Sequence, residues 1–187
     1  QENVKFFNDY WKTEIDPTPG LTVVEIMESI YDRQIKGLYI MGENPAMSDP
    51  NANHAREALA RLDTLVVQDI FLTETAYFAD IVLPASAFPE KTGTFTNTDR
   101  RVQLARKAIN PPGEAKQDLW IIQELAKRLG LDWNYKGPDE VYEELRNCME
   151  SMKNISWERL VNEGAVTYPC DGDDKPGNEV IFGEGFP

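Results

Sequence analysis

Three short apolar runs constrain the fold of this chain more than any other feature. They are Leu38–Met41, Leu65–Val67 and Ile81–Leu83, and each is too short for a stable helix. A glycine follows the first run, a Gln-Asp pair the second and a proline the third. Continuous apolar runs of this length are typical of buried parallel strands. They predict an α/β fold with an open, mostly parallel sheet and helices on both faces, in a Rossmann-like, doubly wound arrangement.

Helical patterns occupy the intervals between these runs. Thr22 and Glu25 have the spacing of a capping box, and apolar residues recur at helical intervals from there to about residue 35. Asp49 and Pro50 are a good N-cap and first-turn pair. Further helices are predicted over 1–15, 50–62, 116–129, 139–152 and 156–162, with about two helical turns over 73–79. Residues 84–101 have no strong period and predict a long functional loop, followed by a short strand over 102–105.

The strength of these patterns divides the chain in two. Residues 1–135 alternate strands and helices and predict one α/β domain. Residues 136–187 predict a helical extension and an irregular tail, because glycine, proline and aspartate dominate the sequence from Thr167 onward. The Asp-Gly-Asp-Asp stretch in that tail lacks the twelve-residue ligand pattern of a calcium loop, so no metal is expected there.

Charge and cysteine content exclude several classes of function. The net charge of −13 argues against nucleic acid and anionic membranes as partners, since both attract clustered Lys and Arg. No apolar run approaches the roughly 20 residues of a membrane span, so no membrane insertion is expected. Cys148 and Cys170 form no CxxC motif and predict reduced thiols in a cytoplasmic protein. The single His54 lies in a helical pattern and predicts a solvated residue rather than a catalytic base, so no catalytic set emerges.

Polar residues at the ends of predicted strands and helices are the candidates for binding. A carboxylate such as Asp69 or Asp118 can accept hydrogen bonds from N1–H and the amino group of guanine. Lys91 suits a phosphate as a point charge. The candidate cofactor-binding residues are Gly42, Asn44, Gln68, Asp69, Lys91 and Asp118.

Each candidate also has a purely structural interpretation. Asn44 can form a turn before a proline, and Gln68 with Asp69 can cap the following short helix. Lys91 can be solvated. Asp118 lies in the first turn of a predicted helix, where the helix dipole favours a carboxylate in any protein.

Three segments resemble one protein family. They read LYIMGENPAMSDP, VVQDIFLTETAYFADIVLPASAFPEKTGTFTNTDRRVQ and NPPGEAKQDLW. They are similar to the molybdopterin oxidoreductases, and within them to the catalytic (alpha) subunit of NAD-linked formate dehydrogenases. The resemblance extends from about Pro19 to the end of the chain. It implies the third, Rossmann-like domain of such an enzyme, which binds one of two molybdopterin guanine dinucleotides.

The resemblance also implies a role for individual residues. Asn44 resembles a pterin-dinucleotide contact in the loop after the first strand. Gln68 and Asp69 resemble a pair that contacts the nucleotide after the next strand. Lys91 matches a lysine near the pterin and phosphates, and Asp118 resembles a further nucleotide-contacting carboxylate.

Members of the family are much longer than this sequence. They add a cysteine cluster for a [4Fe–4S] centre, a metal-ligating Cys or selenocysteine, and a C-terminal β-barrel domain. The whole enzyme implied by the resemblance oxidises formate to CO₂ at molybdenum or tungsten and passes electrons through iron–sulfur clusters to NAD⁺. Its remaining domains and its iron–sulfur and NAD-linked subunits are the expected partners. Residues 136–187 would lead toward the C-terminal domain, and the chain alone is expected to be inactive.

Two other interpretations stay open at this point. The large iron–sulfur subunit of respiratory complex I resembles the same family but uses the fold as a cofactor-free scaffold. Against that, the sequence has Asn44, Asp69, Lys91 and Asp118 in their motif contexts. An independent nucleotide-binding module of flavodoxin or Rossmann type is disfavoured by the missing glycine fingerprint.

Overall fold

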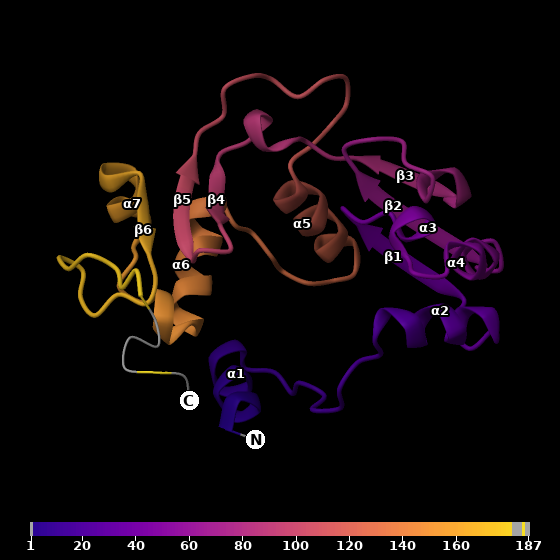
Figure 1. Cartoon of the computed structure of the whole chain (residues 1–187), viewed down its shortest axis with the longest axis horizontal. Helices are drawn as coiled ribbons and strands as arrows, with labels where there is room; N and C mark the ends of the chain where they lie inside the picture. Colours follow the sequence, from indigo (N-terminus) through magenta and orange to yellow (C-terminus); the bar gives the residue numbers. More distant parts are fainter. Residues whose placement is uncertain (1, 181–184, 186–187) are drawn as a thin grey trace. The chain divides into compact units, whose positions relative to one another are not determined.

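The computed structural model describes residues 2–180 and residue 185 (Figure 1). The chain divides into two compact units, Gln1–Ala85 and Ser86–Pro187, and each is described by itself below. The domain boundary predicted after residue 135 stays a prediction. Among the described residues, no helix is long and apolar enough to cross a membrane.

The first unit contains a parallel sheet of three strands, in agreement with the prediction from the apolar runs. The strands lie in the order β1-β2-β3, and the register places Ile40 beside Val67 and Val67 beside Val82. The elements of this unit are α1 (Glu2–Trp11), α2 (Val23–Tyr31), β1 (Gly37–Met41), α3 (Pro45–Ser48), α4 (Ala52–Leu59), β2 (Thr64–Asp69), a 3₁₀ turn (Ala76–Phe78) and β3 (Ile81–Pro84).

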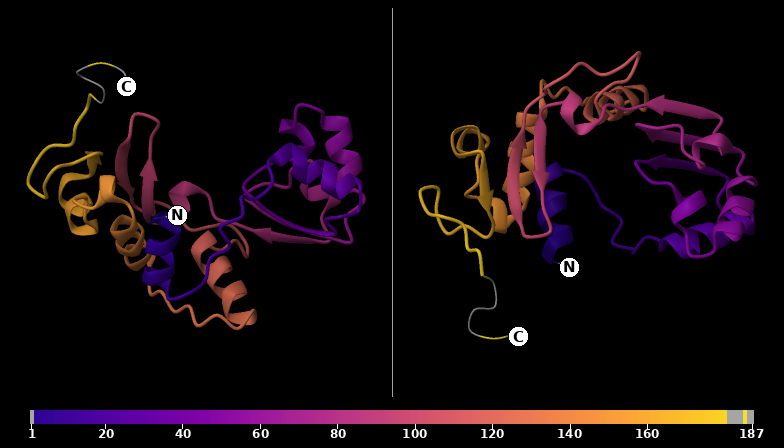
Figure 2. Two further views of the ribbon diagram at one scale, coloured as in Figure 1. Left: turned by 90° about the horizontal axis from the view of Figure 1, so that it is seen from below. Right: turned by 45° about the horizontal axis from the view of Figure 1, so that its top comes forward.

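The core of the first unit lies between this sheet and its helices. Ile40, Leu65 and Val67 project from β1 and β2 toward Ile30 of α2 and Leu59 of α4, and all five side chains are buried. Figure 2 shows these helices along one face of the sheet. This packing holds the carboxyl ends of β1 and β2 in a fixed register, which is what a ligand site at that edge requires.

The helix starts predicted from local sequence patterns in the first unit are partly confirmed. The capping box is present, with Thr22 accepting from Glu25 N and Glu25 accepting from Thr22 N. The predicted cap at Asp49 is wrong. Helix α3 instead begins at Pro45, and α4 begins after Asn51, whose side chain accepts from His54 N. Proline has a φ angle that suits the first turn of a helix, so a helix begins at Pro45, earlier than the apolar pattern indicated. Only a single 3₁₀ turn forms in the stretch predicted to hold two helical turns.

The second unit contains an antiparallel sheet of three strands, in the order β4 (Gly93–Thr96), β5 (Arg101–Ala105) and β6 (Ala165–Thr167). Part of the predicted loop 84–101 is strand β4, which pairs with β5. Four residues are too few to show a strand period, so only pairing with β5 reveals this strand. The elements are η2 (Phe88–Glu90), β4 (Gly93–Thr96), β5 (Arg101–Ala105), α5 (Asp118–Arg128), α6 (Pro138–Cys148), η3 (Glu150–Met152), α7 (Trp157–Glu163) and β6 (Ala165–Thr167).

Helix α5 begins at Asp118 and ends just before the predicted stop at Gly130. Its apolar spacing predicts a buried face of Leu119, Ile122, Ala126 and Leu129, and this prediction is only partly right. Ala126 is buried as predicted, but Ile121 outside that face is buried too, and Leu129 has 72% of its surface exposed. The run Leu-Trp-Ile-Ile makes two neighbouring helix faces apolar, so periodicity alone could not choose between them.

Tyr142 anchors the core of the second unit. It is buried with Val102, Leu160 and Val166, which come from β5, α7 and β6. Its hydroxyl donates a hydrogen bond of 2.9 Å to the carbonyl oxygen of Ile155. Burial raises the pKa of Tyr142 to about 12, because the phenolate would lose its hydration in this position.

This pKa predicts a loss of stability in alkaline solution. The tyrosines of the unfolded chain ionise near pH 10, while Tyr142 in the folded chain keeps its proton to about pH 12. The unfolded state therefore binds fewer protons in this window, and the free energy of unfolding should fall as pH rises, by up to about 1.4 kcal/mol per pH unit from this group. Urea denaturation between pH 9 and 11.5 measures the slope. Tyr142→Phe should flatten it, and equal slopes in both proteins would contradict the assignment.

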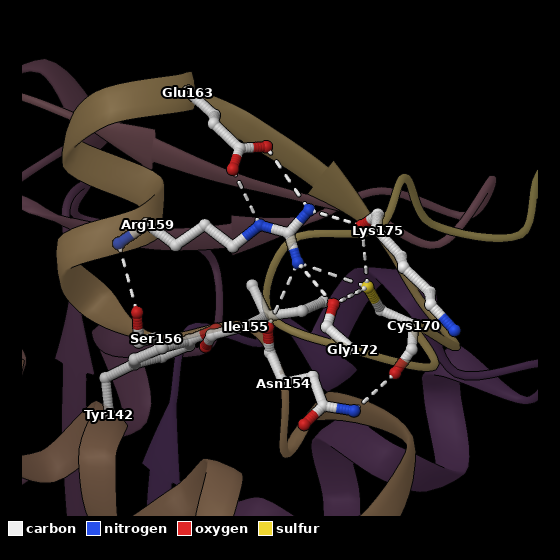
Figure 3. Close-up of polar contacts among 9 residues, drawn as sticks. All are labelled: Tyr142, Asn154, Ile155, Ser156, Arg159, Glu163, Cys170, Gly172 and Lys175. Carbon is white, nitrogen blue, oxygen red and sulfur yellow. Dashed lines mark hydrogen bonds and ion pairs between the residues drawn. The ribbon is translucent and has the colours of Figure 1, made fainter.

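Arg159 ties the segment after β6 to helix α7 (Figure 3). The side chain is buried and donates to the carbonyl oxygens of Asn154, Gly172 and Lys175 at 3.1, 3.2 and 2.6 Å. It also bonds Cys170 Sγ at 3.1 Å and Glu163 at 2.8 Å. Burial opposes the charge on the guanidinium, but the hydrogen bonds and charge interactions with Glu163 and Cys170 outweigh it and raise the pKa of Arg159 above its usual value.

The predicted irregular tail is therefore anchored over part of its length. Residues 168–180 form no helix or strand, as expected from their composition. Yet the buried thiol of Cys170 lies 3.1 Å from the carbonyl oxygens of both Gly172 and Lys175, inside the Arg159 network. The remainder of the predicted tail, residues 181–184 and 186–187, lies outside the described residues.

Candidate functional site

Four of the six candidate residues lie at one edge of the parallel sheet, and we call them the strand-end set: Gly42, Asn44, Gln68 and Asp69. The first two follow β1, and the other two end β2. Because the strands are parallel and adjacent, their carboxyl ends meet at the same edge. Gly42 donates its N–H to the carbonyl oxygen of Gln68 at 2.9 Å, which joins the two halves of the set.

Gly42 allows the chain to turn sharply after β1. Its φ of +64° is in the left-handed region that side chains disfavour. A Cβ added there would meet no atom within 4 Å, so space is not the constraint. The backbone conformation alone accounts for the glycine, and it leaves the loop open above the strand end.

Asn44 bridges this loop to the segment after β2. Its Oδ1 accepts hydrogen bonds from the N–H of Thr75 at 3.1 Å and from the hydroxyl of Thr75 at 2.7 Å. Its Nδ2 donates to Glu74 at 2.8 Å. Asn44 is therefore more than a turn residue, because it connects two loops at the sheet edge.

Gln68 differs from the other candidates because its side chain is fully buried. Its Oε1 accepts a hydrogen bond from the hydroxyl of Tyr39 on the neighbouring strand. Its main-chain oxygen holds Gly42. The structure thus shows Gln68 joining β1 to β2, and its predicted contact with a nucleotide stays a prediction.

Asp69 forms a turn with the residues that follow it. Its Oδ1 accepts the N–H groups of Ile70 at 2.7 Å and Phe71 at 3.2 Å. Within the described part of the chain, its Oδ2 makes no hydrogen bond. The side chains of Ile70 and Phe71 are exposed, Phe71 by 73%. The turn thus uses one carboxylate oxygen of Asp69 and is followed by an exposed aromatic residue, Phe71.

Two carboxylates, Glu43 and Glu74, lie near the strand-end set, and the charge of Arg56 also acts on Glu74. A hydrogen bond from the Asn44 side chain lowers the pKa of Glu74, and one from the Ser48 hydroxyl lowers the pKa of Glu43. Both carboxyl groups therefore stay ionised at pH values at which an ordinary glutamate would already be protonated. Carboxylate oxygens at this edge suit hydrogen-bond donors, such as the N–H groups of a purine.

Lys91 and Asp118 belong to the second unit and form a partly buried ion pair, with 23% and 32% of their side-chain surfaces exposed. Lys91 also donates to the carbonyl oxygen of Ser86 at 3.0 Å. The Ser86 hydroxyl is buried and has no hydrogen-bond partner among the described residues. The structure thus brings Lys91 and Asp118 together, with Asp118 in the first turn of α5.

The sequence interpretation missed Thr75, Glu74 and Tyr39. The signal was present, because Thr73-Glu74-Thr75 lies between two predicted strands within the segment that resembles the family. A pattern of polar residues does not show which strand-end side chain they contact. In the described ranges, 2–180 and 185, no group of three or more side chains is placed to hold a metal ion.

Comparison with known proteins adds independent findings. The profile of the molybdopterin oxidoreductase family matches residues 8–128. The chain is 47% identical to the alpha subunit of an F420-dependent formate dehydrogenase of Methanocaldococcus jannaschii, over 100% of this chain and 28% of that protein. It is 46% identical to a putative formate dehydrogenase of Bacillus subtilis, over 96% of this chain and 18% of that protein.

A solved structure also matches. Acetylene hydratase from Pelobacter acetylenicus has a TM-score of 0.63 and 26% sequence identity, over 78% of this chain and 20% of its own. The chain thus spans only 18–28% of the length of these proteins.

Proposed function

Because this chain belongs to the molybdopterin oxidoreductase family, we propose that it is the part of a formate dehydrogenase that binds molybdopterin guanine dinucleotide. The observation that supports this most is the turn at Asp69. It leaves one carboxylate oxygen open to a ligand at the carboxyl edge of a parallel sheet. That edge is where open α/β sheets bind nucleotides.

The residues at the sheet edge match the chemistry of guanine. Guanine presents N–H groups on its N1 and N2 edge, and a carboxylate accepts both, whereas adenine presents an acceptor at N1. Asp69 supplies the acceptor, and the surrounding negative charge favours donors further. The exposed ring of Phe71, two residues later, offers a flat apolar surface for the base.

Lys91 suits a phosphate group of the same class of ligand. Its ammonium is partly exposed and is positioned by Asp118 and the Ser86 carbonyl. A lysine held in this way presents a positive point charge at a defined position, which suits a phosphate oxygen. Its role toward a phosphate rests on this chemistry and on the motif PEKTGTFTN.

When bound, the pterin would supply the molybdenum or tungsten at which the whole enzyme oxidises formate to CO₂. The residues of this chain hold the nucleotide and take no part in the chemical step, so the chain alone is inactive. The [4Fe–4S] centre and the remaining domains and subunits are expected in other parts of the enzyme. A cytoplasmic location and NAD⁺ as acceptor stay predictions. The relative from M. jannaschii is named as F420-dependent. Rates of formate oxidation by the whole enzyme with NAD⁺ and with F420 would show which of the two is the electron acceptor.

The cofactor-free scaffold, as in the large subunit of complex I, is not favoured. Two of the relatives described above, at 46–47% identity, are formate dehydrogenases by name. A scaffold would also have no need for an acceptor at Asp69 or an ordered ammonium at Lys91.

Titration of the chain with GDP tests the proposed function. We expect saturable binding that shifts the amide NMR signals of Gly42, Asn44 and Asp69, because these groups line the sheet edge. ADP should bind at least about tenfold more weakly, since one lost charge-assisted hydrogen bond is worth about 1.5–3 kcal/mol. The absence of any shift at millimolar GDP, or equal binding of ADP, would overturn the assignment of a guanine site.

A further inference from the structure

The amide of Asn44 can have only one orientation in this structure. The main-chain N–H of Thr75 is a donor, so the Asn44 atom 3.1 Å from it must be the oxygen. The Thr75 hydroxyl lies 2.7 Å from the same oxygen and donates to it, because its own oxygen accepts from Ala46 N at 3.0 Å. Both hydrogen bonds therefore point the Asn44 nitrogen away from Thr75.

Thr75 is well suited to hold this orientation. It is fully buried, so water cannot replace its hydrogen bonds to Asn44 and Ala46. Both acceptor positions of Asn44 Oδ1 are used by Thr75. A ligand can therefore approach only the nitrogen of this side chain, and it must bring an acceptor.

Glu74 supplies that acceptor in this structure. Its carboxylate accepts from Asn44 Nδ2 at 2.8 Å, and the residue is exposed to solvent. An exposed carboxylate gains back its hydration when it leaves, so displacing it costs little. The Glu74 oxygen thus stands where a ligand oxygen would bind.

We propose that Thr75 is a positioning residue that makes Asn44 a dedicated hydrogen-bond donor, and that an oxygen of the bound nucleotide takes the place of the Glu74 carboxylate. This inference rests on the proposed function, because it assigns the ligand group for one residue of the strand-end set. It makes Glu74 a competitor of the ligand and Thr75 an indirect determinant of affinity.

The competition is tested with Glu74→Ala and a matched control, Glu43→Ala. Both variants remove one exposed carboxylate from the same sheet edge, but Glu43 accepts from the Ser48 side chain and Glu74 from that of Asn44. We expect Glu74→Ala to bind GDP about three- to tenfold more tightly than Glu43→Ala does, by calorimetry. Equal affinities in the two variants would overturn the competition, because a general charge effect would then suffice.

The same variants, titrated with guanosine and with pyrophosphate, identify the source of the oxygen. Tighter binding of pyrophosphate by Glu74→Ala than by Glu43→Ala assigns Asn44 to a phosphate oxygen. Tighter binding of guanosine assigns it to an oxygen of the nucleoside. Either result supports an acceptor oxygen at Asn44. If Glu74→Ala binds neither probe more tightly than Glu43→Ala does, and binds GDP no more tightly either, an acceptor oxygen at Asn44 is contradicted.

The positioning role is tested without any ligand. In the wild-type chain, the Asn44 side-chain NH₂ signal should follow the ionisation of Glu74, at a pH below the usual range for glutamate. Thr75→Val should weaken this response, because the hydroxyl that orients Asn44 is lost, and Thr75→Ser should restore it. Thr73→Val is the matched control, since the Thr73 hydroxyl accepts from Ala76 N and does not bond Asn44. An unchanged Asn44 response in folded Thr75→Val would overturn the positioning role.

The two experiments separate this inference from the proposed function. If GDP shifts the Asp69 amide but leaves the Asn44 side chain unmoved, the function stands and the role of Asn44 as a donor fails. If GDP shifts no signal at all, the proposed function fails, and the ligand part of the inference fails with it. The response of Asn44 to pH then still decides whether Thr75 orients this side chain.

Discussion

Replacing Arg159 with methionine is expected to lower the free energy of unfolding by about 3 kcal/mol. Methionine fills much of the same apolar volume but donates no hydrogen bond. The carbonyl oxygens of Asn154, Gly172 and Lys175 would each lose the hydrogen bond from the guanidinium, and each such loss costs about 1 kcal/mol in a buried setting. Urea denaturation measures the total. The rate of amide hydrogen exchange should increase most at residues 170–175.

A matched arginine is available as control. Arg128 also pairs with a glutamate four residues away on the same helix, but its side chain is 69% exposed. Arg128→Met should change stability by less than about 0.5 kcal/mol. If both variants lost the same stability, or if Arg159→Met lost under about 1 kcal/mol, the network drawn in Figure 3 would not be what anchors this segment.

Asp69→Asn should weaken GDP binding about ten- to a hundredfold. Oδ1 of residue 69 is held by the N–H groups of Ile70 and Phe71, so asparagine would turn its NH₂ group toward the ligand. Donor would then face donor on the N1 and N2 edge of guanine, and a charge-assisted interaction worth about 1.5–3 kcal/mol would be lost. Calorimetric titration of the folded variant measures this change. In the whole enzyme, the bound guanine dinucleotide per polypeptide should fall in parallel.

Changing the base provides the control. Xanthine has a carbonyl oxygen where guanine has its amino group, so Asp69→Asn should improve the ratio of XDP to GDP affinity. Asp63→Asn removes a carboxylate that pairs with Arg33 in the same unit, and it should leave both affinities unchanged. Wild-type GDP affinity in folded Asp69→Asn would exclude Asp69 from the binding site.

Several features of the fold followed from the sequence because their causes are local. The apolar runs predicted all three parallel strands, and Thr22 with Glu25 predicted the start of α2. Strand β4 was missed because its identity depends on pairing with β5, a contact that four residues cannot encode by themselves. The buried face of α5 was assigned correctly at Ala126 but wrongly at Leu129, because four consecutive apolar residues make two faces equally apolar.

The candidate site shows the same division. Motif and strand position were enough to select Asn44 and Asp69, which lie at the sheet edge as expected. Sequence could not show that Thr75 holds Asn44, because the two residues are 31 positions apart and meet only after β1 and β2 have paired. The Arg159 network was likewise invisible, since most of its acceptors are main-chain carbonyls, which every residue has.

By itself, therefore, the sequence determined the parallel sheet, the family and the residue types available for binding, because apolar periodicity and motif order are properties of short segments. Only the tertiary structure decided which hydrogen bonds the side chains of those residues make. Hydrogen-bond direction depends on partners brought together across the fold. For that reason Asn44 became a donor, Gln68 a buried connection between strands and Asp69 an acceptor.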